Sequence, residues 1–373
     1  MAGARRANRS PRELCNLRTI SVRRQRGPGM NLIQFYPSVG PQGKGVRLPH
    51  EMTNRRIRYL RLSLTQACQM RCVYCRPDFH TNANAYDLKP VELEQLVKHL
   101  VDRHGVQKVR LTGGDPTARP ELLEIMSRIS RLRTPENQRL ELGMTTNGLS
   151  LVSHASHYAA AGLQRVNVSL DSLDGDTFHQ VTGVDALPRV LAGIEAAVAA
   201  GLTPLKINCV VLRGLNDGQL PELLQFAATR GLELRLIEMM PMGPLKLRWR
   251  SLYMPEAEIR KILEPEVDCW RPLVQGADSA RNYRVITRQG QAVTLGFITP
   301  MSCNFCAHCD RLRITADGRV FPCLMDEPRG SLLSALRPTF NATEFDQILT
   351  RAYERKMPEH PAWGHTMMTQ LGG

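Results

Sequence analysis

Several features are scarce or missing in this chain of 373 residues. No run approaches 18 consecutive apolar residues, so the sequence contains no candidate for a membrane-spanning helix. Aromatic residues make up only 5% of the chain, which argues against the stacking platforms that bind nucleic acids. There is no low-complexity tract. Hydrophobic residues still reach 42%, which supports a sizeable core in one large domain or two of ordinary size.

Acidic residues are nearly absent from the first 30 positions, where Glu13 stands among eight arginines. This segment lacks aromatic residues and helical periodicity, and such composition is typical of disorder. It is rich in arginine and poor in acids, like an organelle transit peptide, and a true start at Met30 is the alternative. We expect residues 1–50 to form a basic, dispensable and disordered extension. The rest of the chain remains basic, and this charge favours a phosphate-bearing partner.

A fourth cysteine is missing after Cys68, Cys72 and Cys75, which have the spacing C-x3-C-x2-C. A [4Fe–4S] cluster held by protein alone takes four thiolates. Three thiolates leave one iron free, which is the arrangement of enzymes that bind S-adenosylmethionine (SAM) on that iron. The alternative is zinc, which needs a fourth ligand from elsewhere, such as His80. The ten cysteines cluster in the sequence, which favours metal binding by reduced thiols over disulfides.

The apolar pattern from residue 57 onward predicts six strand–helix units in a row, which indicates an α/β fold with a parallel sheet. Leu93, Leu96 and Leu100 have helical spacing between Pro90 and Gly105. The other expected helices are 119–133, 151–161, 187–200 and 219–230. The expected strands are 60–64, 109–112, 142–146, 166–170, 205–211 and 234–238. Six units are too few for a closed eight-stranded barrel, so we expect an open, partial barrel.

Polar and glycine-rich segments follow these strands at their carboxyl ends, where parallel α/β proteins build their sites. They are the cysteine loop and the segments 113–116, 145–148, 169–172 and 238–240. Each alone is an ordinary turn signal. Their joint placement on one rim is the stronger observation.

A second triplet follows in Cys306, Cys309 and Cys323, across a predicted hairpin of strands 312–315 and 320–323. Cys303 either supplies a fourth ligand or is a bystander. A zinc ribbon is the alternative to a second iron–sulfur cluster. Alternation in the strand puts Arg311 and Arg313 on one face, where two guanidinium groups can clamp an anion. A solvated strand face is the other interpretation of this pair.

These motifs resemble the GTP 3′,8-cyclase family of radical SAM enzymes, which begins molybdenum-cofactor synthesis. The resemblance runs from about Arg58 to the terminus. It rests on both triplets, on the segments 108–116, 145–148, 168–173, 236–243 and 296–301, and on the final two glycines. It implies a partial (six-unit) βα barrel whose mouth is closed by a C-terminal cluster domain with a β-hairpin. It also implies conversion of GTP to (8S)-3′,8-cyclo-7,8-dihydro-GTP through a 5′-deoxyadenosyl radical.

The resemblance further implies site residues. The metal ligands would be Cys68, Cys72 and Cys75 for one [4Fe–4S] cluster and Cys306, Cys309 and Cys323 for a second. Residues near SAM would be Tyr74, Gly114, Thr145, Ser169 and Met240. Residues binding GTP would be Arg61, Lys108, Arg110, Lys206, Arg311 and Arg313. The catalytic set would be Arg61, Arg311, Arg313, Gly372 and Gly373, because glycine can enter a crowded pocket.

Two positions depart from the family pattern: Arg76 stands where Met is usual, and Asp115 where Glu is usual. Asp115 should therefore reach less far toward the amino group of the cofactor. The alternative enzyme is a radical SAM protein that modifies a peptide, with an auxiliary cluster. From another class, a zinc-stapled nucleic-acid-binding protein would use the same positive charge. We expect neither a nucleic-acid nor a membrane partner.

The expected organisation has four parts. They are the extension 1–50, the barrel 51–245, a cluster and GTP-binding region 246–340, and a C-terminal helix with a Gly-Gly tail over 341–373. The expected partners are GTP, an external flavodoxin-like or ferredoxin-like electron donor, and a second copy of the chain in a homodimer. The expected location is the cytoplasm, or the mitochondrial matrix if the extension is a transit peptide.

Overall fold

The computed structural model describes residues 57–75, 86–274, 278–354, 356–357, 359–360 and 364. The expected extension 1–50, Arg76, His80 and the final two glycines therefore lie outside the described residues. Within the described part, none of the helices combines the length and apolar character that a bilayer crossing requires.

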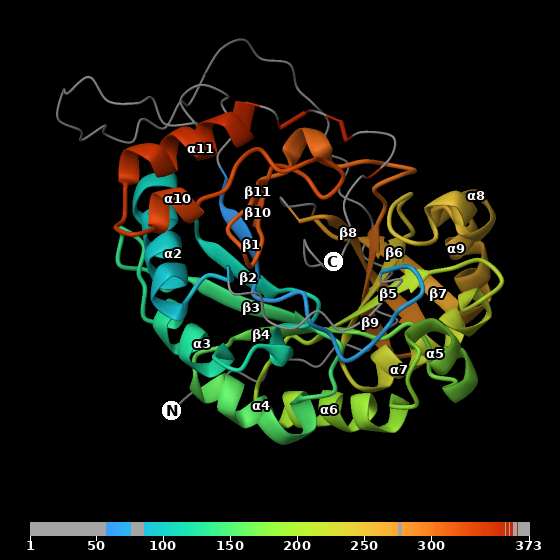
Figure 1. The fold of residues 1–373 in the computed structure, drawn as a ribbon. Coiled ribbons are helices and arrows are strands. Elements are labelled where there is room, and N and C mark those ends of the chain that lie inside the picture. Colours follow the sequence, from blue (N-terminus) through green and yellow to red (C-terminus); the bar gives the residue numbers. More distant parts are fainter. Residues whose placement is uncertain are drawn as a thin grey trace, which may run out of the picture.

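The six predicted strand–helix units are confirmed. The strands are β1 Tyr59–Ser63, β2 Lys108–Thr112, β3 Glu141–Thr146, β4 Arg165–Ser169, β5 Lys206–Val211 and β6 Glu233–Glu238. They lie side by side in chain order, and each neighbouring pair is parallel. The helices between them are α2 Pro90–His104, α3 Leu122–Ser130, α4 Leu151–Ala160, α5 Gly175–Thr182, α6 Leu187–Ala199 and α7 Leu220–Thr229. Figure 1 shows these helices on the outside of the curved sheet.

The helices follow the predicted apolar faces. In α2, Leu93, Leu96 and Leu100 are buried against the sheet, as their spacing predicts. This helix ends at Gly105, whose φ of 74° is the left-handed conformation that glycine adopts readily. The short helix α5 was not predicted. It begins after Asp174, whose side chain accepts a hydrogen bond from the backbone of Thr177.

The C-terminal part adds strands to both ends of this sheet. Strand β9 Ala292–Ile298 runs parallel to β6, and β10 Arg311–Ile314 runs parallel to β1. The predicted hairpin is confirmed, since β10 pairs antiparallel with β11 Val320–Phe321. Beyond β9 lie β8 Ala280–Thr287 and β7 Val267–Pro272, which the sequence did not predict. The strand order begins with β11 and ends with β7, so the barrel is open.

The remaining elements are short, apart from the last helix. They comprise α8 Trp249–Leu252, α9 Glu256–Leu263, α10 Leu333–Leu336 and α11 Ala342–Glu354, with 3-10 turns at Pro116–Ala118, Asp217–Gln219, Lys246–Arg248, Glu264–Glu266 and Cys306–His308. Helix α11 docks on α2 through a buried carboxylate. Nε2 of His99 and Nε2 of His104 each lie 2.8 Å from the same Oδ1 of Asp346. The C-terminal region is thereby attached to the first helix of the barrel.

Candidate active site

A cavity of about 340 Å³ lies inside the barrel, and residues from both the amino and the carboxyl ends of the parallel strands line it. All six cysteines of the two triplets line this one cavity. The other described residues that the sequence assigned to the site line it as well: Arg61, Tyr74, Lys108, Arg110, Gly114, Thr145, Ser169, Lys206, Met240, Arg311 and Arg313. Gly372 and Gly373 lie outside the described residues, so their predicted role stays a prediction.

The loop of the first triplet is held by close backbone contact with the glycine segment after β2. The N–H of Gly114 donates to the carbonyl of Thr65 at 2.8 Å, and the N–H of Asp115 donates to the carbonyl of Ala67 at 2.8 Å. A Cβ atom on Gly114 would lie 2.4 Å from the carbonyl oxygens of both Gln66 and Ala67. Only glycine therefore allows this approach.

Asp115 is buried and engaged with its own chain. Its Oδ1 accepts from the N–H of Thr117 at 2.9 Å. Its Oδ2 accepts from the N–H of Asn147 at 2.6 Å and the hydroxyl of Thr146 at 2.9 Å. Burial raises the pKa of Asp115, although these hydrogen bonds oppose the shift. Asp115, which is shorter than the glutamate usual in the family, thus links the loop after β2 to the loop after β3.

Tyr74, inside the first triplet, is anchored to the loop after β4. Its hydroxyl donates to Oδ2 of Asp171 at 2.6 Å, and the N–H of Val210 donates to Oδ1 at 2.8 Å. Burial raises the pKa of Asp171 to about 6. The cysteine loop is therefore fixed against two further strands of the barrel.

The second triplet begins after a segment that Glu238 holds in place. Oε2 of Glu238, at the end of β6, accepts from the N–H groups of Met301 at 3.1 Å and Ser302 at 2.9 Å. Its Oε1 accepts from the N–H of Glu256 at 3.0 Å. This buried carboxylate ties the approach to Cys306 to the barrel rim.

Charges near the second triplet favour thiolate at Cys309. Burial by itself would raise the pKa of this thiol, but the positive charges of Lys356 and Arg311 outweigh it and lower the pKa. Nζ of Lys356 also donates to the carbonyl of Arg311 at 2.8 Å. The N–H of Met325 donates to Sγ of Cys323 at 3.5 Å. Cys303 is exposed and, in the described part of the chain, does not belong to the cavity lining.

Strand register gathers positive charge on one wall of the cavity. Arg61 in β1 lies opposite Arg110 in β2 and opposite Arg313 in β10, and Tyr59 lies opposite Arg311. Like charges directly across strands destabilise a sheet, and burial of a guanidinium costs more. Burial lowers the pKa of Arg61 to about 10 and that of Arg313 well below its usual range. An anion bound in the cavity would offset this cost.

Arg110 has a specific recess. Its Nε donates to the hydroxyl of Tyr59 at 3.0 Å, and its Nη1 donates to Oδ1 of Asn167 at 3.1 Å. A Cβ on Gly143 in β3 would lie 2.7 Å from the guanidinium carbon. Glycine at this position therefore makes the room that the side chain fills.

The two lysines have carboxylate partners from neighbouring strands. Nζ of Lys108 lies 3.3 Å from Oε2 of Glu141, and Lys206 pairs with Glu233. Burial lowers the pKa of Lys206, and the nearby charge of Arg235 adds to the effect. Both lysines lie at the amino ends of their strands, so they line the cavity on the side away from the first triplet.

Sequence reasoning missed several polar residues of the cavity wall, among them Tyr59, Asn167, Asn208 and Arg235. One pattern could have revealed them: in each strand a polar residue alternates with buried apolar neighbours. Arg235 between Leu234 and Leu236 is an example. Several lining atoms are buried and make no hydrogen bond among the described residues, including Oγ1 of Thr112, Oγ1 of Thr145, Oδ1 of Asn208 and Nε of Arg235. Buried polar atoms of this kind are suited to a ligand that completes their bonding.

Two family descriptions match consecutive parts of the chain. The Radical SAM superfamily matches residues 62–227, and Molybdenum Cofactor Synthesis C matches residues 232–362. A protein of Sinorhizobium medicae (strain WSM419) named GTP 3′,8-cyclase is 39% identical over 308 residues, which are 82% of this chain and 86% of the relative. The chain belongs to the GTP 3′,8-cyclase family. Another family member, from Rhizobium etli (strain CIAT 652), is 37% identical over 331 residues and 88% of each chain.

Solved structures support the fold of this family member. The structure of Streptococcus suis SuiB bound to precursor peptide SuiA has a TM-score of 0.58 and 16% identity, covering 84% of this chain and 68% of SuiB. The structure of SuiB bound to S-adenosylmethionine has a TM-score of 0.56 and 15% identity, covering 81% of this chain and 68% of SuiB. The predicted fold class and the resemblance inferred from the motifs are therefore confirmed.

The residues present fit the cofactors of a radical SAM protein. Cys68, Cys72 and Cys75 form no disulfide, and all three line the cavity. The N–H of Met70 donates to Sγ of Cys68 at 3.4 Å, as is common for sulfur ligands of iron–sulfur clusters. Three sulfur ligands leave one iron of a [4Fe–4S] cluster open, and the cavity beside it has room for a ligand. A closed zinc site would need a fourth ligand, and His80, the candidate from the sequence, lies outside the described residues.

Proposed function

We propose that this protein is a radical SAM cyclase that converts GTP to (8S)-3′,8-cyclo-7,8-dihydro-GTP, the first step of molybdenum-cofactor synthesis. One observation carries the proposal: both cysteine triplets and the cluster of Arg61, Arg311 and Arg313 line the same cavity. A nucleotide triphosphate needs several cations, and its base and ribose need to lie between two reactive centres. The family membership of the chain supports this assignment.

The proposal includes two [4Fe–4S] clusters, one in each triplet. When bound, the first cluster and SAM would supply the 5′-deoxyadenosyl radical that removes the hydrogen atom from ribose C3′ of GTP. The barrel strands and the two cysteine loops line the cavity, so they would shield that radical. The second triplet would hold a cluster against the guanine, with Cys303 outside the ligand set.

The protein's own residues would hold the triphosphate. Arg61, Arg110, Arg311 and Arg313 form one wall of the cavity, which we call the arginine wall. The described cations come from adjacent strands, so they point into the cavity together: Arg61 from β1, Arg110 from β2 and Arg313 from β10. Guanidinium groups bind phosphate oxygens in bidentate fashion. Arg235 from β6 adds a buried Nε toward the same cavity.

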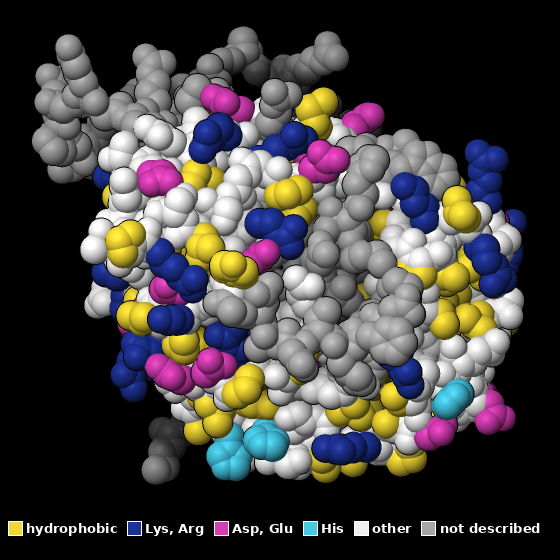
Figure 2. All heavy atoms as spheres, in the orientation of Figure 1, with side chains coloured by type: hydrophobic (Ala, Val, Ile, Leu, Met, Phe, Trp, Pro, Cys, Tyr) yellow, Lys and Arg dark blue, Asp and Glu magenta, His cyan; other side chains and the backbone are white. Residues whose placement is uncertain are grey.

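The remaining partners are proposals. We propose an external flavodoxin-like or ferredoxin-like donor for the first cluster and a homodimeric assembly. We also propose a reducing compartment, the cytoplasm or the mitochondrial matrix, where thiols of this kind keep clusters. On the face in Figure 2, Lys and Arg side chains lie scattered among Asp and Glu and form no continuous stripe. This face therefore shows no basic stripe of the kind that the zinc-stapled nucleic-acid-binding alternative needs.

The test is anaerobic reconstitution followed by turnover. The reconstituted protein should be brown and carry about eight iron atoms per chain, four for each triplet. With GTP, SAM and dithionite it should form the cyclised nucleotide and 5′-deoxyadenosine, read by mass spectrometry. A peptide-modifying enzyme would leave GTP unchanged. A colourless protein that binds only zinc under these conditions would rule out the proposal.

A further inference from the structure

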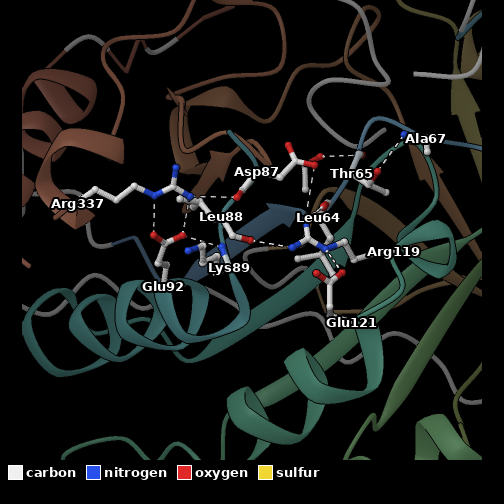
Figure 3. Close-up of polar contacts among 11 residues, drawn as sticks. Leu64, Thr65, Ala67, Asp87, Leu88, Lys89, Glu92, Arg119, Glu121 and Arg337 are labelled. Carbon is white, nitrogen blue, oxygen red and sulfur yellow. Dashed lines mark hydrogen bonds and ion pairs between the residues drawn. The ribbon is translucent and has the colours of Figure 1, made fainter. Parts of the chain in front are cut away.

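A short segment, Asp87 to Lys89, lies against the turn of the β10–β11 hairpin and is joined through Arg119 to the chain just after β1. The backbone of Leu88 bonds in both directions. Its N–H donates to the carbonyl of Ala316 at 2.7 Å, in the turn of the β10–β11 hairpin that leads to Cys323. Its carbonyl accepts from Nη2 of Arg119 at 2.9 Å (Figure 3). Leu88 is 1% exposed, so both bonds are shielded from water.

Arg119 joins this segment to the start of the first cysteine loop. Its Nη1 donates to the carbonyl of Leu64, just after β1, at 3.2 Å. Its Nε donates to Glu121 at 2.8 Å, and Nη1 lies 3.5 Å from Oδ2 of Asp87 (Figure 3). The Arg119 side chain is 5% exposed. One buried guanidinium therefore connects the chain before Cys68 with the chain after Cys75.

Arg337 joins the same segment to the C-terminal part. Its Nε and Nη2 bond the two carboxylate oxygens of Glu92 at 2.6 and 2.9 Å, a bidentate pair. Its Nη2 also donates to the carbonyl of Asp87 at 3.2 Å (Figure 3). Glu92 in turn accepts from the N–H of Lys89 at 2.7 Å, which fixes the start of α2.

We propose that Arg119 and Arg337 are positioning residues that set the separation of the two cysteine loops through the segment Asp87–Lys89. Arg119 fixes the first loop against the segment, and Arg337 together with Ala316 fixes the C-terminal part against it. Neither arginine lines the cavity. The proposal rests on the proposed function, since it concerns a nucleotide held between two clusters. Displacement of reacting groups by about 1 Å can reduce a rate about a hundredfold, so this separation matters.

The two arginines should differ in effect. Arg119→Met leaves the carbonyls of Leu64 and Leu88 without their donor, so the first loop should shift. We expect SAM affinity to fall about tenfold, the effect of losing one or two hydrogen bonds. The SAM-induced change in the electron paramagnetic resonance spectrum of the reduced first cluster should weaken in parallel. Arg337→Met should leave that spectrum unchanged and raise the ratio of 5′-deoxyadenosine to cyclised product several-fold.

Arg128 in α3 is the control arginine, because it too pairs with carboxylates: Glu94 of α2 at 2.7 Å and Glu124 of its own helix at 2.8 Å. It touches no loop carbonyl among the described residues. Arg128→Met should leave SAM affinity and product ratio within twofold of the original protein. Iron content and circular dichroism are measured for every variant.

If Arg119→Met does not fold, Arg119→Lys tests the positioning role instead. Lysine keeps the positive charge but can reach only one of the two carbonyls. It should show an intermediate loss of SAM affinity. The proposal is overturned if a folded Arg119 variant keeps the original spectrum, SAM affinity and product ratio, or if Arg128→Met has the same effects. Failure of the proposed function is distinguishable, because the original protein would then leave GTP unchanged while the spectra of the first cluster could still be compared.

Discussion

Arg313 offers a sharp test of the arginine wall. The change Arg313→Met removes the charge and keeps an apolar stem of similar length. Losing one charge-assisted contact costs about 1.5–3 kcal/mol, so the KM for GTP should rise by roughly one to two decades. The KM for SAM should stay within about twofold, because Arg313 lies on β10 beside Arg61 and not in the first cysteine loop.

The stability of the ligand-free Arg313→Met protein can also be predicted. Burial and the nearby charge of Arg61 lower the pKa of Arg313, so its charged form is held at a cost. Removing that charge should leave the melting temperature unchanged or raise it. Loss of substrate affinity without loss of stability would separate a binding role from a structural one.

Ligand-dependent melting gives a second measurement. At a GTP concentration of 100 times the Kd, binding stabilises the folded protein by about 2.7 kcal/mol. A thirtyfold weaker Kd leaves about 1 kcal/mol at the same concentration. Arg128→Met serves as the control for loss of an arginine elsewhere. An unchanged KM for GTP, together with full stabilisation by GTP, would refute the assignment of Arg313 to the substrate.

Three further outcomes are expected. Gly114→Ala should abolish SAM binding while the far-ultraviolet circular dichroism stays native, because its Cβ would meet two backbone oxygens at 2.4 Å; SAM binding by equilibrium dialysis checks this. Tyr59 has a pKa of about 8, because the charges of Arg110 and Arg61 outweigh its burial. Ionisation adds a negative charge to the arginine wall, so kcat/KM for GTP should fall as pH rises through 8, and the fall should be absent in Tyr59→Phe. Cys323→Ser should lower the iron content by up to about four atoms per chain, reduce GTP cyclisation and spare SAM cleavage. An equal loss of SAM cleavage and of GTP cyclisation would contradict separate clusters.

The six barrel units could be predicted because each strand buries both faces or alternates regularly, and each helix carries one apolar face. Strand β7, Val267–Pro272, could not be predicted, since it lies at the sheet edge, buries only Val267 and ends in proline. Helix α5 was missed because a second, more strongly apolar helix follows it before β5.

The site was predictable where residues formed motifs and less so where they stood alone. The triplets, the glycine segment and the paired arginines of β10 are compact signals. Asn208 and Arg235 are single polar residues inside strands, and such residues are equally common facing solvent. The network of Arg119, Leu88 and Ala316 depends on backbone carbonyls from distant segments, which residue types alone do not reveal.

The pairing of β9 with β6 and of β10 with β1 has a consequence for how the chain can be divided. A fragment ending near residue 230 would expose β1 as a bare edge, and β6 would be absent altogether. The complementary fragment would carry β6, β9 and β10 without the strands β1 to β5 that lie between β6 and β10. Exposed edges of this kind invite aggregation. Neither half should therefore accumulate alone, whereas the two polypeptides produced together should reassemble around their shared sheet.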